Sequence, residues 1–175
     1  MSESELRDEL ARHHIAAFGW AMACCRRDVS LAESTLQSAY LKVLDGRAVF
    51  QGRSAFRTWL FGVIRFTARE ERRRAIVQRL FLLRSDPPPT PEETSERSEL
   101  RDRVTRALRQ LPRRQREVLE LVFYHDMTLD EAAEVMGVST GTVHVHYARG
   151  KMRLRQLLSP EKPNDARRPR PADVV

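Results

Sequence analysis

Hydrophobic residues recur along most of this chain at intervals of three and four residues, the spacing of one face of an α-helix. Runs of β-branched residues are rare, so we expect no sheet. The chain is therefore predicted to be all-α. The apolar stripes predict helices over residues 3–26, 30–44, 54–83, 100–111, 112–123, 128–136 and 140–158.

The ends of the last helices are well marked. Pro112 suits a first helical position, because its missing N–H would be unpaired there anyway. Thr128 and Glu131 have the spacing of a capping box, Gly137 tolerates the positive φ of a C-terminal cap, and Ser139 is a favourable N-cap. Helix, tight turn and hydroxyl-capped helix together predict a helix-turn-helix, whose second helix enters the DNA major groove.

The helix over 140–158 is predicted to have a core face and an outer face. The apolar side chains expected to pack in this domain are Val118, Leu119, Leu121, Val122, Phe123, Leu129, Ala132, Ala133, Met136, Val143, Tyr147, Leu154 and Leu158. The outer face comprises His144, Val145, Ala148 and Arg149, followed by Lys151, Arg153 and Arg155. Three arginines, Arg113, Arg114 and Arg116, begin the 112–123 helix, where cations and helix-end N–H groups suit phosphates.

Charge narrows the class of partner. The net charge is +7 and the pI is about 10.2, which favours a polyanion, either nucleic acid or an acidic membrane surface. No apolar run approaches a membrane span and no signal peptide opens the chain, so we expect a cytoplasmic, nucleoid-associated protein without membrane insertion. The adjacent Cys24 and Cys25 bridge poorly, and we expect them to be small core residues in a reducing compartment.

A segment rich in proline and acidic residues, 84–99, separates two groups of predicted helices. Its sixteen residues, extended at roughly 3.3 Å each, reach about 50 Å, or on the order of 15 base pairs. Two DNA-binding domains joined in this way can bind two sequence elements that are separated along one duplex. We expect small helical domains at 1–83 and 100–158, a flexible linker at 84–99 and a disordered basic tail at 159–175.

Two parts of the sequence resemble the sigma-70 family, and in particular its short extracytoplasmic-function (ECF) type. Residues 50–60, Phe-Gln-Gly-Arg-Ser-Ala-Phe-Arg-Thr-Trp-Leu, are similar to sigma region 2. The second part is similar to region 4 and comprises 111–112, 114–115, 117–119, 128–138, 141–143 and 148–151. The resemblance covers roughly Glu5 to Leu158 and implies a factor that binds core RNA polymerase, recognises −35 and −10 promoter elements and initiates transcription of a specific regulon.

The resemblance also implies three sets of contact residues. The −35 duplex is expected to meet Arg113, Arg114, Ser139, Thr140, Thr142, His144, Val145, Ala148, Arg149 and Lys151. The melted −10 strand is expected to meet Arg47, Phe50, Gln51, Arg53 and Arg57, because single strands are held by cationic grooves and by stacking of unpaired bases. The clamp helices of the largest polymerase subunits are expected to meet Glu33, Ser34, Gln37, Ser38 and Leu41.

The polymerase-binding helix departs from the family pattern. Typical acidic residues are replaced by Leu31, Ser34 and Ser38, which leaves Glu33. A phosphate adds about −1.5 to −2 charges, so we hypothesise that a Ser/Thr kinase activates the factor at Thr35 or Ser34 by restoring the negative charge. The alternatives are that these hydroxyls are ordinary surface, or that an anti-sigma factor controls the protein.

Two further departures concern DNA contacts. His144 and His146 stand where the family often has Lys or Arg, and Phe66 replaces a family asparagine. Side chains two residues apart on a helix diverge, so we expect no metal site at the two histidines. We also expect no cofactor and no catalytic residues.

Two other classes of protein fit parts of the sequence. A free-standing helix-turn-helix regulator would bind a palindromic duplex as a dimer. A His-dependent nuclease would need a cluster of carboxylate and histidine residues that the sequence does not assemble.

Overall fold

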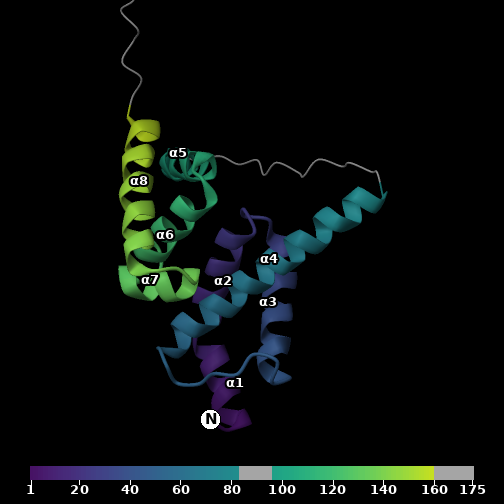
Figure 1. The fold of residues 1–175 in the computed structure, drawn as a ribbon. Coiled ribbons are helices and arrows are strands. Elements are labelled where there is room, and N and C mark those ends of the chain that lie inside the picture. Colours follow the sequence, from purple (N-terminus) through teal and green to yellow (C-terminus); the bar gives the residue numbers. More distant parts are fainter. Residues whose placement is uncertain (83–95, 160–175) are drawn as a thin grey trace, which may run out of the picture.

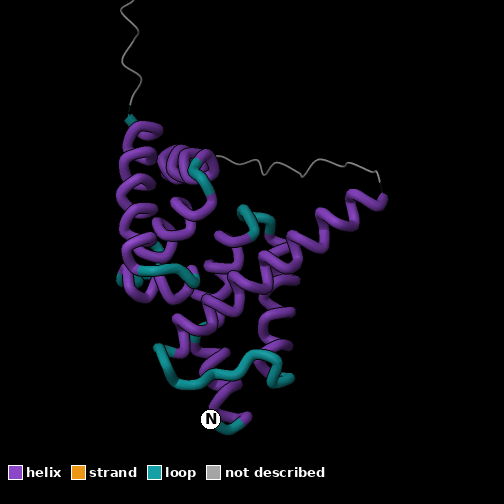
Figure 2. Tube along the Cα trace, in the orientation of Figure 1, coloured by secondary structure: helices purple, strands orange, loops and turns teal. Residues whose placement is uncertain are grey.

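The computed structural model describes residues 1–82 and 96–159, and these two ranges contain helices and no strands (Figures 1 and 2). The all-α prediction is therefore confirmed for this part of the chain. Most of the predicted linker and tail lies outside the described ranges. The helices are α1 (Glu3–Arg12), α2 (His14–Cys24), α3 (Val29–Leu44), α4 (Phe56–Leu82), α5 (Glu96–Gln110), α6 (Arg113–Phe123), α7 (Leu129–Met136) and α8 (Thr140–Leu158).

The first half is built around Trp20 of α2. This side chain is fully buried, its indole Nε1 donates a hydrogen bond of 3.0 Å to the carbonyl oxygen of Phe61, and its ring stacks on the Phe61 ring. Leu36 of α3 and Leu60 of α4 belong to the same core. Cys24 and Cys25 are free and buried, as predicted.

Several helix ends differ from those predicted. The predicted 3–26 helix is broken at His13, so that the mostly exposed α1 leaves the body while the apolar α2 runs through it. Asp28 caps α3, because its carboxylate accepts the Leu31 N–H at 2.9 Å, and this helix begins one residue earlier than predicted. The Ala55 carbonyl accepts the first bond of α4, which begins two residues later than predicted.

Two other boundaries shift by one to four residues. The α5 helix begins at Glu96, so the last four residues of the predicted linker are helical. Pro112 occupies the N-cap of α6 rather than its first helical position. No helix within the described ranges is both long and apolar enough to cross a membrane.

The two halves of the molecule pack against each other. Helix α7 lies on α4, α6 lies on α2, and one hydrophobic core runs from Trp20 through Val118 and Met136 to Val143 (Figure 1). We call this contact of α2 and α4 with α6 and α7 the seam. The sequence predicted two domains held apart by a linker and did not predict the seam.

Polar groups in the seam are paired across it. Arg65 of α4 is 5% exposed, and its Nε and Nη2 donate to one carboxylate oxygen of Glu117 at 3.1 and 3.0 Å. Its Nη1 donates at 2.8 Å to the carbonyl oxygen of Met136, the last residue of α7. Arg27 donates to both carboxylate oxygens of Glu120, at 3.0 and 3.3 Å. Each pair joins the first half of the chain to the second.

Candidate nucleic-acid interface

Local hydrogen bonds fix the turn between α7 and α8. Thr128 and Glu131 form a complete capping box at the start of α7, as predicted. Gly137 ends α7 with φ of 62°, a conformation that costs glycine little. The Ser139 hydroxyl then accepts the Thr142 N–H at 3.3 Å and caps α8. The predicted helix-turn-helix is confirmed in each of these elements.

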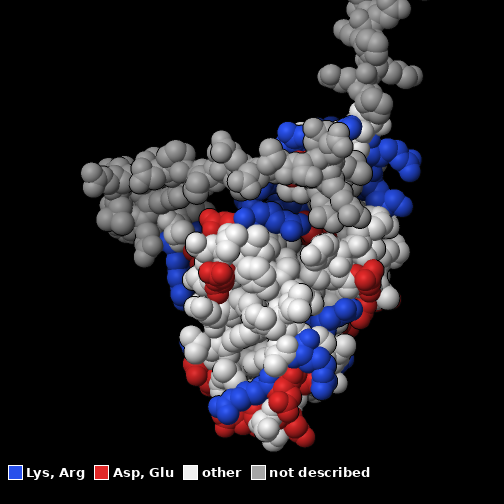
Figure 3. Space-filling view, turned by 180° about the vertical axis from the view of Figure 1, so that it is seen from behind, with Lys and Arg blue, Asp and Glu red and all other residues white. Residues whose placement is uncertain are grey.

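The two faces of α8 are clearly separated. Val143 is fully buried in the core, whereas Tyr147, Leu154 and Leu158 are half-buried at its edge. The outer residues His144, Val145, Ala148 and Arg149 are exposed, as are Lys151, Arg153 and Arg155. In Figure 3 the basic side chains project along the edge of the molecule that α8 forms, while much of the middle of that view is uncharged.

Gly150 allows α8 to pass close to α6. A Cβ at this position would lie 3.2 Å from both the carbonyl oxygen of Gln115 and Cδ1 of Leu119. The close crossing brings the start of α6 beside the basic part of α8. Arg114 is exposed there, while Arg113 is half-buried, with its Nε 3.5 Å from a carboxylate oxygen of Glu117. The residues expected at the −35 duplex are thus brought onto one continuous surface.

Most of that surface is free to meet DNA. Among the ten residues expected at the −35 duplex, Thr142 and Arg113 are half-buried and the others are exposed. The Lys151 ammonium lies 5.1 Å from the centre of the Tyr147 ring, which holds the cation near the helix surface. An exposed helix N-terminus with a basic flank is suited to phosphate contact, and the exposed His144, Val145 and Ala148 are suited to reading base edges.

The residues expected at the −10 strand lie in the 45–55 loop and at the start of α4. Arg47, Gln51 and Arg53 are exposed. Phe50 is half-buried, and its ring centre lies 5.3 Å from those of Phe56 and Trp59. Trp59 therefore packs within an aromatic cluster.

Arg57 and the α4 groove complete this region. Arg57 is half-buried. A groove on α4 is lined by Trp59, Val63 and Phe66, and Glu134 of α7 stands at its border. The Phe66 ring is 58% exposed and lies under the Lys42 ammonium, 5.4 Å away. Glu134 thus lies beside the face of α4 that carries Phe66, the residue that replaces the family asparagine.

The expected polymerase-binding residues lie on one side of α3. Glu33, Ser34, Gln37 and Leu41 are exposed and Ser38 is half-buried. Leu41, with 54% of its surface exposed, adds an apolar side chain at the C-terminal end of this otherwise polar set.

Thr35 does not belong to that face, and the expectation that it is presented there is wrong. The residue is fully buried, and its hydroxyl donates to a Glu71 carboxylate oxygen at 2.5 Å and lies 3.4 Å from the Cys25 sulfur. A kinase cannot reach this oxygen without unfolding the helix packing. A phosphate there would also face the Glu71 carboxylate. Of the two hydroxyls expected as phosphorylation sites, Ser34 alone is accessible.

The polar residues of the seam were not predicted from the sequence; they are Arg27, Arg65, Glu117, Glu120 and His125. His125 is 5% exposed, and its ring packs edge-on against Phe61 at 4.9 Å and Trp20 at 5.9 Å. Its buried Nε2 has no hydrogen-bond partner within the described part of the chain. One signal was present: Glu117 and Glu120 interrupt the apolar stripe of α6 at helical spacing, which predicts buried partners of opposite charge.

Comparisons with known proteins agree with this architecture. The family model described as "Sigma-70 region 2" matches residues 10–76, and "Sigma-70, region 4" matches residues 101–154. RNA polymerase sigma factor CarQ of Myxococcus xanthus is 28% identical over 160 residues, which cover 90% of this chain and 91% of that protein. ECF RNA polymerase sigma factor SigM of Mycobacterium tuberculosis is 29% identical over 151 residues, 86% of this chain and 76% of that protein.

The fold is shared with solved structures. The sigma factor RpoE of Bartonella quintana, crystallised with the anti-sigma factor NepR, superposes with a TM-score of 0.67 at 24% identity, over 88% of this chain and 96% of that one. CnrH, solved with the cytosolic domain of CnrY, gives a TM-score of 0.65 at 24% identity, over 90% and 89%. With region 2 matched in the first half and region 4 in the second, the chain belongs to the sigma-70 family and is of the ECF type.

Proposed function

We propose that this protein is an alternative sigma factor that binds core RNA polymerase, recognises −35 and −10 promoter elements and initiates transcription of a specific regulon. The observation that carries the proposal is the exposed outer face of α8, which a buried Val143 and a capped turn hold in a fixed orientation. In this proposal the chain has no catalytic residues of its own, and the polymerase performs the chemistry.

We assign the two promoter elements to the two halves. Residues 100–158 read the −35 duplex, with His144, Val145, Ala148 and Arg149 at base edges and Arg114 and Lys151 at phosphates. Residues 1–83 hold the melted −10 strand with the exposed cations of the 45–55 loop and with Arg57.

Reading both elements requires the halves to separate. In the packed arrangement α7 lies on α4, and the Glu134 carboxylate borders the α4 groove. A carboxylate at that place repels the phosphates of an incoming strand. We therefore assign the packed arrangement to the free factor and a separated arrangement to the promoter complex.

The exposed side of α3 is the proposed docking surface for the clamp helices of the largest polymerase subunits. Leu41 supplies an apolar contact there, and Glu33 supplies a negative charge. The acidic residues typical of this helix are missing. We therefore propose that docking is controlled either by an added negative charge or by a binding partner. We retain phosphorylation as a hypothesis at Ser34, whose side chain is exposed.

An anti-sigma factor is the other proposed controller. The structures that share this fold, RpoE with NepR and CnrH with CnrY, are complexes of a sigma factor with a second protein. A partner that covers the α3 surface or holds the seam closed would keep this factor inactive.

Transcription from defined components tests the proposal. We expect the purified protein, or its Ser34→Glu variant, to co-elute with bacterial core RNA polymerase and to support run-off transcription from a promoter of its regulon. An Arg149→Ala variant should keep the co-elution and lose promoter-specific transcripts. Dimeric protein that binds a palindromic duplex and never associates with polymerase would instead establish the free-standing regulator.

A separate experiment tests the phosphorylation hypothesis. A Ser34→Ala variant should lose promoter activity in cells while it folds as the parent does, and Ser34→Glu should retain activity. Full activity of Ser34→Ala excludes phosphorylation at this serine and leaves the anti-sigma factor as the proposed controller.

A further inference from the structure

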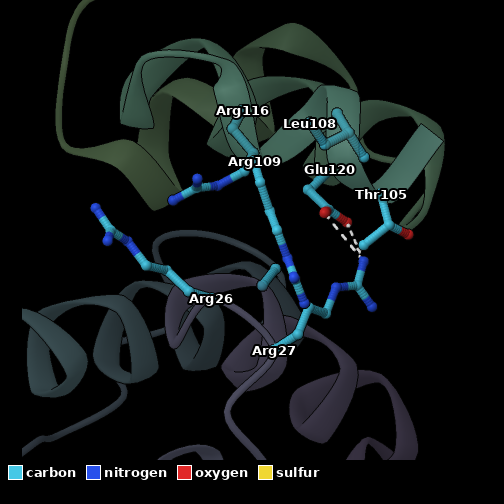
Figure 4. Close-up of a pocket in the computed structure, with 8 residues that line it drawn as sticks. Arg26, Arg27, Thr105, Leu108, Arg109, Arg116 and Glu120 are labelled. Atoms are coloured by element: carbon cyan, nitrogen blue, oxygen red, sulfur yellow. Dashed lines mark hydrogen bonds and ion pairs between the residues drawn. The ribbon is translucent and has the colours of Figure 1, made fainter. Parts of the chain in front are cut away.

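Four arginines line one small cavity at the edge of the seam (Figure 4). Arg26 and Arg27 follow α2, Arg109 is on α5 and Arg116 is on α6. The enclosed part of the cavity measures about 10 Å³, and the space between these side chains, with the part open to solvent, about 260 Å³. Its other lining residues are Ala23, Thr105, Leu108 and Glu120. Both halves of the chain therefore contribute cations to the same space.

The charges around this cavity do not balance. Glu120 is its one carboxylate, and Arg27 already donates to both of its oxygens. The side chains of Arg26, Arg109 and Arg116 form no hydrogen bond or ion pair with the residues that the structure describes. Among these described residues, four guanidinium groups and one carboxylate line the cavity.

Arg116 makes this imbalance costly, because it is only 7% exposed. Burial, followed by the nearby charge of Arg26, lowers the pKa of its guanidinium. A charge removed from water needs a partner of opposite sign or several hydrogen bonds. The charges of Glu117 and Glu120 act in the other direction, but within the described part of the chain neither carboxylate accepts a hydrogen bond from Arg116, so the site has more donors than acceptors.

The backbone at Arg26 and Arg27 is also unusual. Both residues have positive φ, 58° and 67°, in the left-handed region where glycine or asparagine is ordinarily found. If these positions served only to form the turn, glycine or asparagine would be expected there rather than two successive arginines. Strained backbone of this kind is typical of sites that clamp a ligand, and here the turn sends Arg26 and Arg27 to opposite sides of the cavity that both line (Figure 4).

We propose that this cavity binds one small oxyanion of the phosphate class, held between Arg26 after α2, Arg109 of α5 and Arg116 of α6. The planar guanidinium fork matches the spacing of two oxygens on such an ion. Arg26 and Arg109 are exposed and can close over the ion, while Arg116 forms the floor. The site depends on the seam and does not depend on the proposed function.

An ion held by both halves should stabilise their packed arrangement. Phosphate binding to the folded, packed protein raises its unfolding midpoint by mass action. We expect the thermal midpoint of the full-length protein to rise with inorganic phosphate, at constant pH and ionic strength, and to reach a plateau. Equilibrium dialysis with labelled phosphate should give one bound ion per chain.

Single substitutions locate the site. Arg109→Gln and Arg26→Gln remove exposed side chains that make no hydrogen bond or ion pair within the described structure, so both variants should fold. We expect each to weaken phosphate binding at least tenfold. Arg106→Gln is the matched control, because Arg106 is exposed on the same helix and does not line the cavity. Its phosphate affinity should equal that of the parent.

Two results would overturn the proposal. One is an equal loss of affinity in Arg106→Gln, or the same rise in midpoint with chloride, since either means general screening of a basic protein. The other is a short DNA duplex whose binding depends on Arg26 and Arg109 while free phosphate does not bind. In that case the phosphates that occupy the site belong to nucleic acid.

Discussion

Arginine has opposite roles in two regions of this molecule. In the seam, Arg65 is almost fully buried and its guanidinium is held by Glu117 and by the Met136 carbonyl. On α8, Arg149 and Arg153 extend into solvent. The residue type is the same, and the surroundings decide whether its charge holds the protein together or remains available to a ligand.

The difference indicates which property each arginine should control. A buried cation whose partner is removed must be desolvated without compensation, so changes in the seam should alter the free energy of unfolding. An exposed cation loses little on folding, so changes on α8 should alter DNA affinity. The predictions below test this separation.

The largest effect is expected at the buried ion pair. Glu117→Leu leaves Arg65 charged and without its carboxylate, which should lower the free energy of unfolding by about 3–5 kcal/mol. Urea denaturation followed by the fluorescence of Trp20, which lies in the same core, measures the change. The double variant Arg65→Met with Glu117→Leu is the control and should recover most of the loss, because well-packed apolar residues often replace a buried pair without cost. A loss below about 1 kcal/mol in the single variant would indicate a solvated pair and therefore open halves in solution.

Protonation of His125 should produce the next largest effect. Burial, with help from the charges of Arg57 and Arg27 and against that of Asp126, lowers the pKa of His125 from 6.5 to about 4. Between these values the unfolded chain binds a proton that the folded chain does not, so stability falls as the pH falls from about 6.5 towards 4. The full loss is about 3 kcal/mol.

Unfolding free energies measured at several pH values test this slope. The His125→Gln variant is the control, since glutamine does not titrate, and its pH slope should differ from that of the parent only between about pH 4 and pH 6.5. The pH profile of Arg149→Ala should match that of the parent because Arg149 is far out on the exposed face of α8. Equal slopes in parent and His125→Gln would show that this ring is accessible to water and protons.

The two regions also differ in how well the sequence predicts them. Thr128, Gly137 and Ser139 act on residues within four positions of themselves, so their roles follow from spacing alone. Arg65 and Glu117 are 52 positions apart, and no periodicity links them. The helix-turn-helix was therefore predicted element by element, whereas the seam was not.

Residues at the edge of the core were mispredicted for the same reason. From the sequence, Thr35 is expected on the surface of an amphipathic helix. In the structure its hydroxyl donates a hydrogen bond to the Glu71 carboxylate, and this bond allows Thr35 to be buried. Phe123 looks like a core residue but is 60% exposed, with its ring stacked on Tyr147. In each case the tertiary partner, which lies far away in sequence, decides burial.

On the exposed side of the comparison, Arg149→Ala should weaken binding to the −35 duplex by about 1–3 kcal/mol. The free energy of unfolding should stay within about 0.5 kcal/mol of the parent value. Fluorescence anisotropy with a labelled promoter duplex measures the first quantity and urea denaturation the second. Arg155→Ala is the control, because this residue is exposed near the other end of α8 and should affect binding less. A variant that lost stability and kept its affinity would reverse the roles assigned to the two regions.

The smallest effects are expected at Ser139, where both roles meet in one side chain. Its hydroxyl caps α8 through the Thr142 N–H, and the residue is exposed at the edge of the proposed −35 surface. Ser139→Ala should cost about 1 kcal/mol of stability, because the cap is lost. Ser139→Asp keeps a good cap and should hold the stability within a few tenths of a kcal/mol of the parent, while its negative charge opposes the DNA phosphates and lowers the affinity. The Ala variant therefore reports on folding and the Asp variant on binding at one position.

If Asp lowered the stability as much as Ala and left the affinity unchanged, Ser139 would lie away from the bound duplex, and the −35 surface would have to begin further along α8.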